Sequence, residues 1–139
     1  MSSDYPDVGA PPPFSEISGR RLRILVVDDE PSVRSVITAH LHNEGHEVVT
    51  AEDGVRGLEC FVGEASDLIL TDRIMPGMSG DELATAIKRL NPKMPVVLVT
   101  AFADRPPDPA RQRSPFDLVI RKPFTRDTLR AAIALLCRS

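Results

Sequence analysis

The amino-acid sequence predicts an α/β fold, a doubly wound parallel sheet of five strands with helical connections. Five short apolar runs rich in β-branched residues are separated by stretches in which apolar residues recur at helical spacing. Three runs are apolar throughout, which is typical of strands buried on both faces of a parallel sheet. The 139 residues suffice for one domain with one core.

The N-terminal stretch differs in composition from the remainder. Residues 1–21 contain prolines 6, 11, 12 and 13 among small and polar residues. Such a segment cannot bury enough apolar surface to offset the entropy lost on ordering. We therefore expect a flexible, proline-rich tail over residues 1–21 and a folded domain over residues 22–139.

The predicted strands take residues 24–27, 48–50, 68–71, 96–99 and 118–120. Each is too short for a helix, and together they alternate with the helical stretches as βαβ units require. In sheets of this kind, ligands bind beyond the carboxyl ends of the strands. The residues that directly follow the apolar runs are therefore the candidate functional residues.

Four stretches between and after the strands carry apolar stripes at helical spacing. Pro31 lies near the first turn of the first helix and Gly45 ends it, Pro92 follows the third, and Thr125 is the expected N-cap of the last. The stripes are Val33, Val36, Ile37 and Leu41; Val55, Leu58, Val62 and Ala65; Leu83, Ile87 and Leu90; and Leu129, Ile133 and Leu136.

The connection over residues 101–116 departs from this pattern. It contains Pro106, Pro107, Pro109 and Pro115 where a fourth crossover helix belongs. Proline removes a backbone donor and clashes with the preceding turn. We expect the fourth helix to be short or displaced.

Composition excludes several classes of function. The net charge of −3 gives no overall basic footprint for direct nucleic-acid binding. No apolar run approaches the roughly 18–20 residues of a membrane span, and no signal peptide is evident. Cys60 and Cys137 are too few for a disulfide-stapled secreted domain. A cytoplasmic protein without membrane contact is expected.

Acidic side chains follow the first and third runs, namely Asp28, Asp29 and Asp72. Carboxylates that converge on one sheet edge repel each other unless a cation intervenes, and a hard cation such as Mg²⁺ prefers oxygen ligands. Thr100 and Lys122 follow the fourth and fifth runs and are donors suited to a phosphoryl group. An aspartate beside them can act as a nucleophile and form an acyl phosphate.

Simpler interpretations exist for each residue alone. Asp28 and Asp29 could form a solvated loop or a helix cap, and Thr100 and Lys122 could be ordinary strand-end residues. The three histidines near the end of the first helix are poor metal candidates, because side chains two residues apart on a helix point in different directions. They are His40, His42 and His46.

The motifs taken together resemble the receiver domain of bacterial two-component response regulators. The residues that carry the resemblance are ILVVDDE at 24–30, DRIMPGMSG at 72–80, Thr100-Ala101 and Lys122-Pro123-Phe124. The resemblance covers residues 22–139. It implies a flavodoxin-like sheet with strand order 2-1-3-4-5 and a cis Lys122–Pro123 bond.

The resemblance also implies the roles of the acidic residues. Asp72 would be the phosphoacceptor and a ligand of Mg²⁺ or Mn²⁺. Asp29 would bind the metal directly, Asp28 would act through a metal-bound water, and the backbone carbonyl of Ile74 would complete the protein ligands.

Three further residues would bind the phosphoryl group. Lys122 would pair with Asp72 and then with the phosphoryl group, Thr100 would hydrogen-bond it, and Ala101 is small enough to admit it. The phosphoryl donor would be a phosphohistidine on a sensor histidine kinase or a histidine phosphotransfer protein.

Two departures from the family pattern bear on signalling. The switch position, three residues before Lys122, holds Val119 where the family has Tyr or Phe. Pro115 replaces the usual glycine before the fifth strand. We expect an output that does not rely on coupling between Thr100 and an aromatic side chain.

The two positions that tune dephosphorylation are apolar. Ile74 and Phe102 lie two residues beyond Asp72 and Thr100. Neither side chain can orient a hydrolytic water, so slow loss of the phosphoryl group is expected.

Three functions follow as alternatives. The leading one is a phosphoacceptor switch that catalyses only its own phosphorylation and dephosphorylation, is a monomer or weak dimer, and passes its signal to an output protein or domain. A phosphatase of the haloacid dehalogenase type fits poorly, because residues 28–32 read DDEPS and not Asp-x-Asp-x-Thr. A receiver-like interaction module that carries no phosphate is the third.

Overall fold

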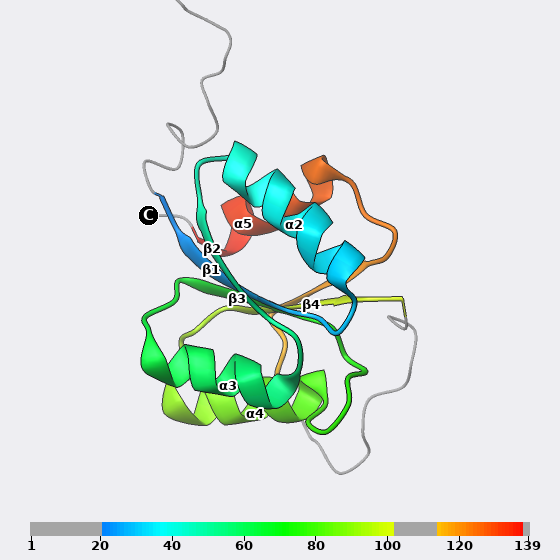
Figure 1. Ribbon diagram of the computed structural model, residues 1–139. Coiled ribbons are helices and arrows are strands. Elements are labelled where there is room, and N and C mark those ends of the chain that lie inside the picture. Colours follow the sequence, from blue (N-terminus) through cyan, green and yellow to red (C-terminus); the bar gives the residue numbers. More distant parts are fainter. Residues whose placement is uncertain (1–20, 102–113, 138–139) are drawn as a thin grey trace, which may run out of the picture.

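A computed structural model describes residues 21–101 and 114–137. These residues form a five-stranded parallel sheet with the order β2-β1-β3-β4-β5, which confirms the predicted topology (Figure 1). The strands are β1 (Arg23–Val27), β2 (Glu47–Ala51), β3 (Leu68–Thr71), β4 (Val96–Thr100) and β5 (Leu118–Arg121). Their bounds agree with the predicted runs to within one residue.

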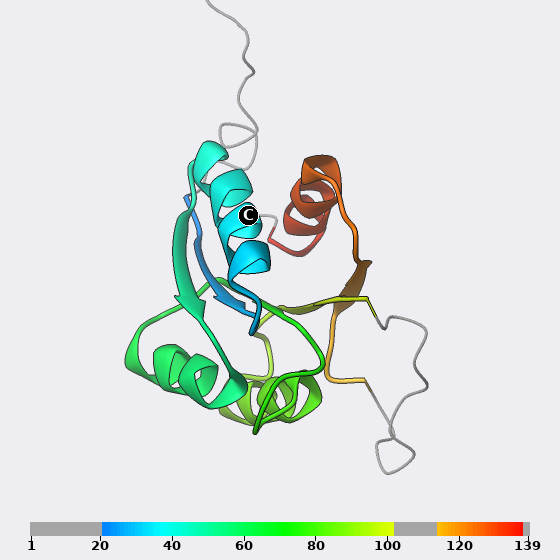
Figure 2. The same cartoon turned by 45° about the vertical axis from the view of Figure 1, so that its right-hand side comes forward.

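Helices cover both faces of the sheet. They are α2 (Pro31–Asn43), α3 (Gly54–Gly63), α4 (Gly80–Leu90) and α5 (Arg126–Leu136). Figures 1 and 2 show α2 and α5 on one face and α3 and α4 on the other. The segment 102–113, which carries most of the connection where a short or displaced helix was predicted, lies outside the described residues.

Local sequence signals fix the ends of the helices. Pro31 begins α2, and Gly45 follows it with φ of +89°, a conformation that favours glycine. The Thr125 hydroxyl accepts a hydrogen bond from the Thr128 N–H, which confirms Thr125 as the N-cap of α5. Ser79 and Glu82 form a reciprocal capping box at the start of α4.

Two apolar layers, one on each face, hold the sheet between the helices. On one face Ile37 of α2 and Leu129 of α5 pack against β1 and β3, and on the other face Leu83 and Ile87 of α4 do so. The central strands β3 and β4 are buried along their whole length. This burial on both faces is what a continuously apolar parallel strand predicts.

The predicted apolar face of α3 is wrong in part, because Leu58 packs against the core while Val55, Val62 and Ala65 are exposed. Val55 and Val62 are 49% and 68% exposed, and the face toward the sheet instead contains Gly54 and Gly57. A side chain at Gly57 would lie 2.8 Å from the Val27 side chain, so glycine allows α3 to approach β1 closely. Val36 and Leu90, assigned to the stripes of the first and third helices, are also exposed.

Candidate functional site

The parallel register brings the two main acidic segments to one edge of the sheet. Val27 pairs with Thr71, so Asp28 and Asp72 leave adjacent strands at the same level. The Asp72 N–H donates to the Val27 carbonyl at 3.0 Å, and the Asp28 N–H donates to the Ala51 carbonyl at 3.2 Å. Both aspartates are therefore anchored by their backbone at the carboxyl end of the sheet.

Carboxylate oxygens of Asp28, Asp29 and Asp72 lie within 4.8 Å of one another. Among the residues that the structure describes, this is the one group of three or more acidic, histidine or cysteine side chains that could hold a metal ion. Oxygen donors at this spacing fit a hard divalent cation such as Mg²⁺. The predicted acidic residues are thus brought together.

Asp28 is the most buried of the three, with 1% of its surface exposed. Its Oδ1 accepts a hydrogen bond from the Glu30 N–H at 2.9 Å, and its Oδ2 accepts one from Lys122 Nζ at 3.0 Å. Burial raises the pKa of Asp28, although both hydrogen bonds oppose the change. The Asp28 carboxylate therefore benefits strongly from a nearby cation.

Lys122 supplies positive charge at the end of β5. Its Nζ lies 3.0 Å from Asp28 Oδ2, 3.4 Å from Asp72 Oδ2 and 3.8 Å from Glu30 Oε1. Burial lowers the pKa of Lys122, but the interactions with Asp28 and Asp72 outweigh it and the pKa is raised. The ammonium is thus charged and faces the carboxylates.

Asp72 is 9% exposed, and backbone atoms of the loop that leads to α4 lie close to it. Its Oδ1 accepts a hydrogen bond from the Arg73 N–H at 2.7 Å, while its Oδ2 faces Lys122. The Gly80 N–H donates to the Arg73 carbonyl at 2.8 Å. A side chain at Gly80 would overlap the Asp72 carbonyl, so glycine at the start of α4 is required for the loop to close over Asp72.

The remaining predicted residues differ in exposure. Thr100 is fully buried at the end of β4, and its carbonyl accepts a hydrogen bond from the Lys122 N–H at 3.0 Å. Ala101 is exposed, and Ile74 is 43% exposed. Phe102 lies outside the described residues. The Lys122–Pro123 peptide bond is cis, as the resemblance implies.

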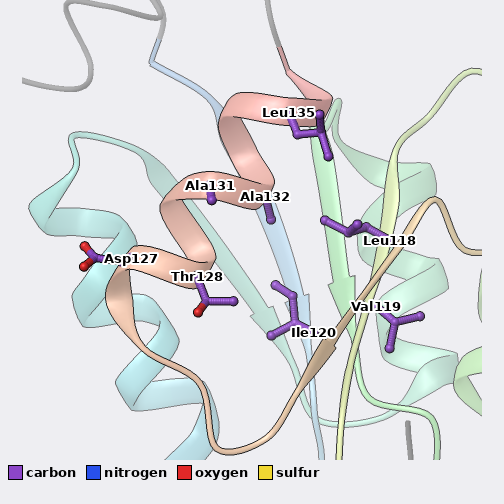
Figure 3. Close-up of a pocket in the computed structure, with 8 residues that line it drawn as sticks. All are labelled: Leu118, Val119, Ile120, Asp127, Thr128, Ala131, Ala132 and Leu135. Atoms are coloured by element: carbon purple, nitrogen blue, oxygen red, sulfur yellow. The ribbon is translucent and has the colours of Figure 1, made fainter. Parts of the chain in front are cut away.

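Val119, at the switch position, is 46% exposed on the edge strand β5. It lies at an apolar groove of about 460 Å³ between β5 and α5 (Figure 3). The groove is lined by Leu118, Val119, Ile120, Asp127, Thr128, Ala131, Ala132 and Leu135.

The three histidines do not approach the acidic cluster as a group. His46 lies beyond the end of α2 and is buried, where its Nδ1 accepts a hydrogen bond from the Leu22 N–H at 3.1 Å. Burial lowers the pKa of His46. This residue therefore belongs to the core, as a neutral imidazole.

Sequence reasoning assigned no individual role to three residues around the cluster, although Glu30 and Gly80 lie within the motifs at 24–30 and 72–80. Glu30 lies near Lys122, Gly80 allows close packing against Asp72, and Arg34 Nη1 donates a hydrogen bond to the Asp28 carbonyl at 2.6 Å. Gly80 could have been noticed because Ser79 and Glu82 spell a capping box around it. The Arg34 contact has no local sequence signal, because its acceptor is a backbone carbonyl.

No helix within the described ranges, 21–101 and 114–137, is long and apolar enough to cross a membrane.

Comparison with protein families matches residues 24–134 to the response regulator receiver domain. The transcriptional regulatory protein GlrR of Escherichia coli K12 is 34% identical over 84% of this chain and 26% of its own length. The sensor histidine kinase RcsC of Salmonella typhimurium is 37% identical over 82% of this chain and 12% of its own length. The chain thus spans about a quarter or less of these two relatives.

Solved structures show the same architecture. A receiver domain protein from Clostridium thermocellum is 31% identical, with a TM-score of 0.76 over 84% of this chain and 94% of its own. The response regulator TrrA from Thermotoga maritima, solved in complex with Mg²⁺ and BeF, is 36% identical, with a TM-score of 0.75 over 83% of this chain and 98% of its own.

Proposed function

The chain belongs to the response regulator receiver domain family, and from this premise we propose that it is a phosphoacceptor switch of a two-component phosphorelay. Asp72 accepts the phosphoryl group from a phosphohistidine on a sensor histidine kinase or a histidine phosphotransfer protein. The observation that carries the proposal is the Asp72 carboxylate, held 3.4 Å from Lys122 Nζ within a cluster of three aspartates.

The proposed reaction moves one phosphoryl group. An Asp72 carboxylate oxygen attacks the phosphorus, a new O–P bond forms, and the N–P bond to the donor histidine breaks. Asp28, Asp29, Asp72 and the Ile74 carbonyl would hold Mg²⁺, which neutralises charge on the transferring group. Water later cleaves the acyl phosphate and releases inorganic phosphate.

Lys122 and Thr100 are the donors for the phosphoryl oxygens. The Lys122 ammonium already balances Asp28 and Asp72, and it is near enough to pair with added negative charge at Asp72. Thr100 is the last residue of β4, which lies between β3 and β5. The small side chain of Ala101 would leave room for the phosphoryl group. The chain acts on no separate substrate in this proposal and is not a conventional enzyme. Mn²⁺ would replace Mg²⁺ at the same oxygen ligands.

Val119 supports an unusual output. A small aliphatic side chain at the switch position cannot rotate inward as Tyr or Phe would. We propose a cytoplasmic monomer or weak dimer that signals through another protein or domain, without itself contacting nucleic acid or membrane. GlrR and RcsC are both longer than this chain. The proposal therefore also holds if the chain is one part of a larger regulator or kinase.

Phosphorylation by acetyl phosphate in the presence of Mg²⁺, followed by intact-protein mass spectrometry, tests the proposal. The wild-type chain should gain one phosphoryl group, and Asp72→Asn should gain none. Asp127→Asn is the matched control, because Asp127 is 83% exposed on α5, and it should behave as wild type.

A phosphorylated Asp72→Asn variant would assign the acceptor to another residue. A wild-type chain that is neither phosphorylated nor bound by Mg²⁺ and beryllium fluoride would contradict the phosphoacceptor role. That result would favour an interaction module that carries no phosphate.

A further inference from the structure

Arg34 directs its side chain back to the acidic loop that precedes its own helix. It is the fourth residue of α2, and its Nη1 donates a hydrogen bond to the Asp28 carbonyl at 2.6 Å. The Arg34 backbone N–H meanwhile begins the helical ladder by donating to the Glu30 carbonyl at 3.1 Å. The side chain is half-buried, so the guanidinium is held close to the sheet edge.

The Asp28 carbonyl occupies a critical position. It belongs to the peptide group that links Asp28 to Asp29, the two acidic residues at the end of β1. Rotation of that peptide plane would change the relative direction of the two carboxylates. Asp28 also lies one residue beyond Val27, the last residue of β1 paired with its neighbouring strands.

Arg34 completes the set of contacts that immobilise Asp28. The Asp28 N–H donates to Ala51, Oδ1 accepts from the Glu30 N–H, and Oδ2 accepts from Lys122. With the Arg34 contact, every polar group of Asp28 has a partner. The carbonyl contact is also the shortest of the four.

The location of Arg34 is otherwise unfavourable for a cation. The positive end of a helix dipole lies at the N-terminus, where acidic residues are preferred. The first turn of α2 has no acidic residue, and its N-cap Glu30 makes no side-chain cap. The helix dipole therefore gives no reason for arginine here, whereas the hydrogen bond to the acidic loop does.

We propose that Arg34 is a positioning residue that fixes the Asp28–Asp29 peptide plane and thereby sets the geometry of the metal-binding carboxylates. The proposal rests on the proposed function, because Mg²⁺ binding is the property that it deepens. Arg34 touches neither the phosphoryl group nor the metal in this role.

Mg²⁺ affinity separates positioning from simple electrostatics, because the two effects have opposite signs. Arg34→Met keeps most of the aliphatic stem and removes both the charge and the donors. Loss of a cation beside the cluster would by itself strengthen Mg²⁺ binding, since repulsion is removed. Loss of positioning weakens it, and we expect about a tenfold weaker affinity.

The matched control is Arg56→Met, which makes the same change of charge at an exposed arginine paired with Glu59 on α3. Isothermal titration with MgCl₂ should give wild-type affinity for this control. Urea unfolding in EDTA verifies that each variant is folded. An Arg34→Met affinity equal to or tighter than wild type, or an equal loss in Arg56→Met, overturns the proposal.

A measurement without metal keeps the proposal testable on its own. Amide hydrogen exchange at Glu30, whose N–H donates to Asp28 Oδ1, should be faster in Arg34→Met than in wild type and unchanged in Arg56→Met. Unchanged exchange in folded Arg34→Met contradicts positioning. Arg34→Lys, which keeps a donor, should retain more protection than Arg34→Met, and an equal loss would also contradict it.

Failure of this inference differs from failure of the proposed function. If wild type binds Mg²⁺ and Arg34→Met binds equally well, only the role of Arg34 is lost. If wild type binds no Mg²⁺, the phosphoacceptor proposal is lost.

Discussion

Asp28 and Lys122 place opposite charges where water has little access. Burial raises the pKa of Asp28, and pairing with Asp28 and Asp72 raises the pKa of Lys122. The stabilising contribution of Lys122 is fully present at pH values below its ordinary pKa of 10.5. It is lost as the pH rises through the higher pKa that Lys122 has in the folded protein. Near neutral pH the ammonium therefore remains charged and offsets the repulsion among the carboxylates.

The buried imidazole of His46 makes stability depend on pH. Burial lowers its pKa from 6.5, so folding favours the neutral form. The contribution of His46 to stability is fully present at pH values above 6.5. It is lost as the pH falls toward and through the lower pKa that His46 has in the folded protein. We expect wild type to lose unfolding free energy through this residue as the pH drops from about 7 to about 5.

Urea unfolding at both pH values checks the effect of His46. His46→Gln keeps a polar side chain near the Leu22 N–H and removes the titration, so the loss on acidification should be smaller than in wild type. His42→Gln, at an exposed position on α2, should retain the wild-type loss. Equal slopes in all three proteins would assign the acid sensitivity to other groups.

The side chains at positions 74 and 102 should govern the lifetime of the acyl phosphate. Ile74 is 43% exposed and lies two residues after Asp72. The side chains of Ile74 and Phe102 are both apolar. The double variant Ile74→Asn and Phe102→Glu offers polar groups that can orient water. We expect it to lose phosphate about tenfold faster or more, measured by the decay of phosphoprotein after donor removal. An unchanged rate would contradict the shielding argument.

At the scale of elements, the start of α4 determines how the phosphoacceptor loop closes. A methyl group at Gly80 would overlap the Asp72 carbonyl, whereas one at Gly63, the last residue of α3, would meet nothing. We expect Gly80→Ala to cost about 3 kcal/mol of unfolding free energy. Gly63→Ala, also in a helix, should be neutral or gain about 0.5 kcal/mol through the unfolded state.

Chemical denaturation of the two alanine variants measures this difference. Gly80→Ala should also weaken Mg²⁺ binding, because relief of the overlap must move either α4 or the end of β3. A Gly80→Ala protein as stable as Gly63→Ala would show that α4 can shift away from Asp72 without cost.

At the scale of the whole molecule, the β5–α5 side carries the switch position that departs from the family pattern. Val119 is exposed at the groove in Figure 3, and its side chain is too small for an aromatic switch. We expect Mg²⁺ with beryllium fluoride to alter amide exchange in residues 100–125 without producing a symmetric dimer through this face. Analytical ultracentrifugation with and without the mimic measures the second point, and a stable dimer through β5 and α5 would contradict it.

The topology and the acidic cluster could be predicted because the signals are local and repeated. Each apolar run ends at a polar residue, and parallel strands place such ends together. Val55 and Val62 were mispredicted as part of the buried face of α3 because they follow helical spacing, while the close approach at Gly57 depends on Val27 from β1. The contact of Arg34 with Asp28 could not be predicted for a related reason. Its acceptor is a backbone carbonyl, and every residue has one.

The Lys122–Asp28 contact joins residues 94 positions apart in the sequence. Closing a loop of this length costs chain entropy, which the docking of β1 and β5 into the sheet must offset. While β1 or β5 is undocked, the carboxylates of the cluster stay hydrated and need no counterion. The charge balance of the site is thus a property of completed folding, and a nascent chain that has exposed only β1 to β3 carries the acidic residues without the lysine that neutralises them.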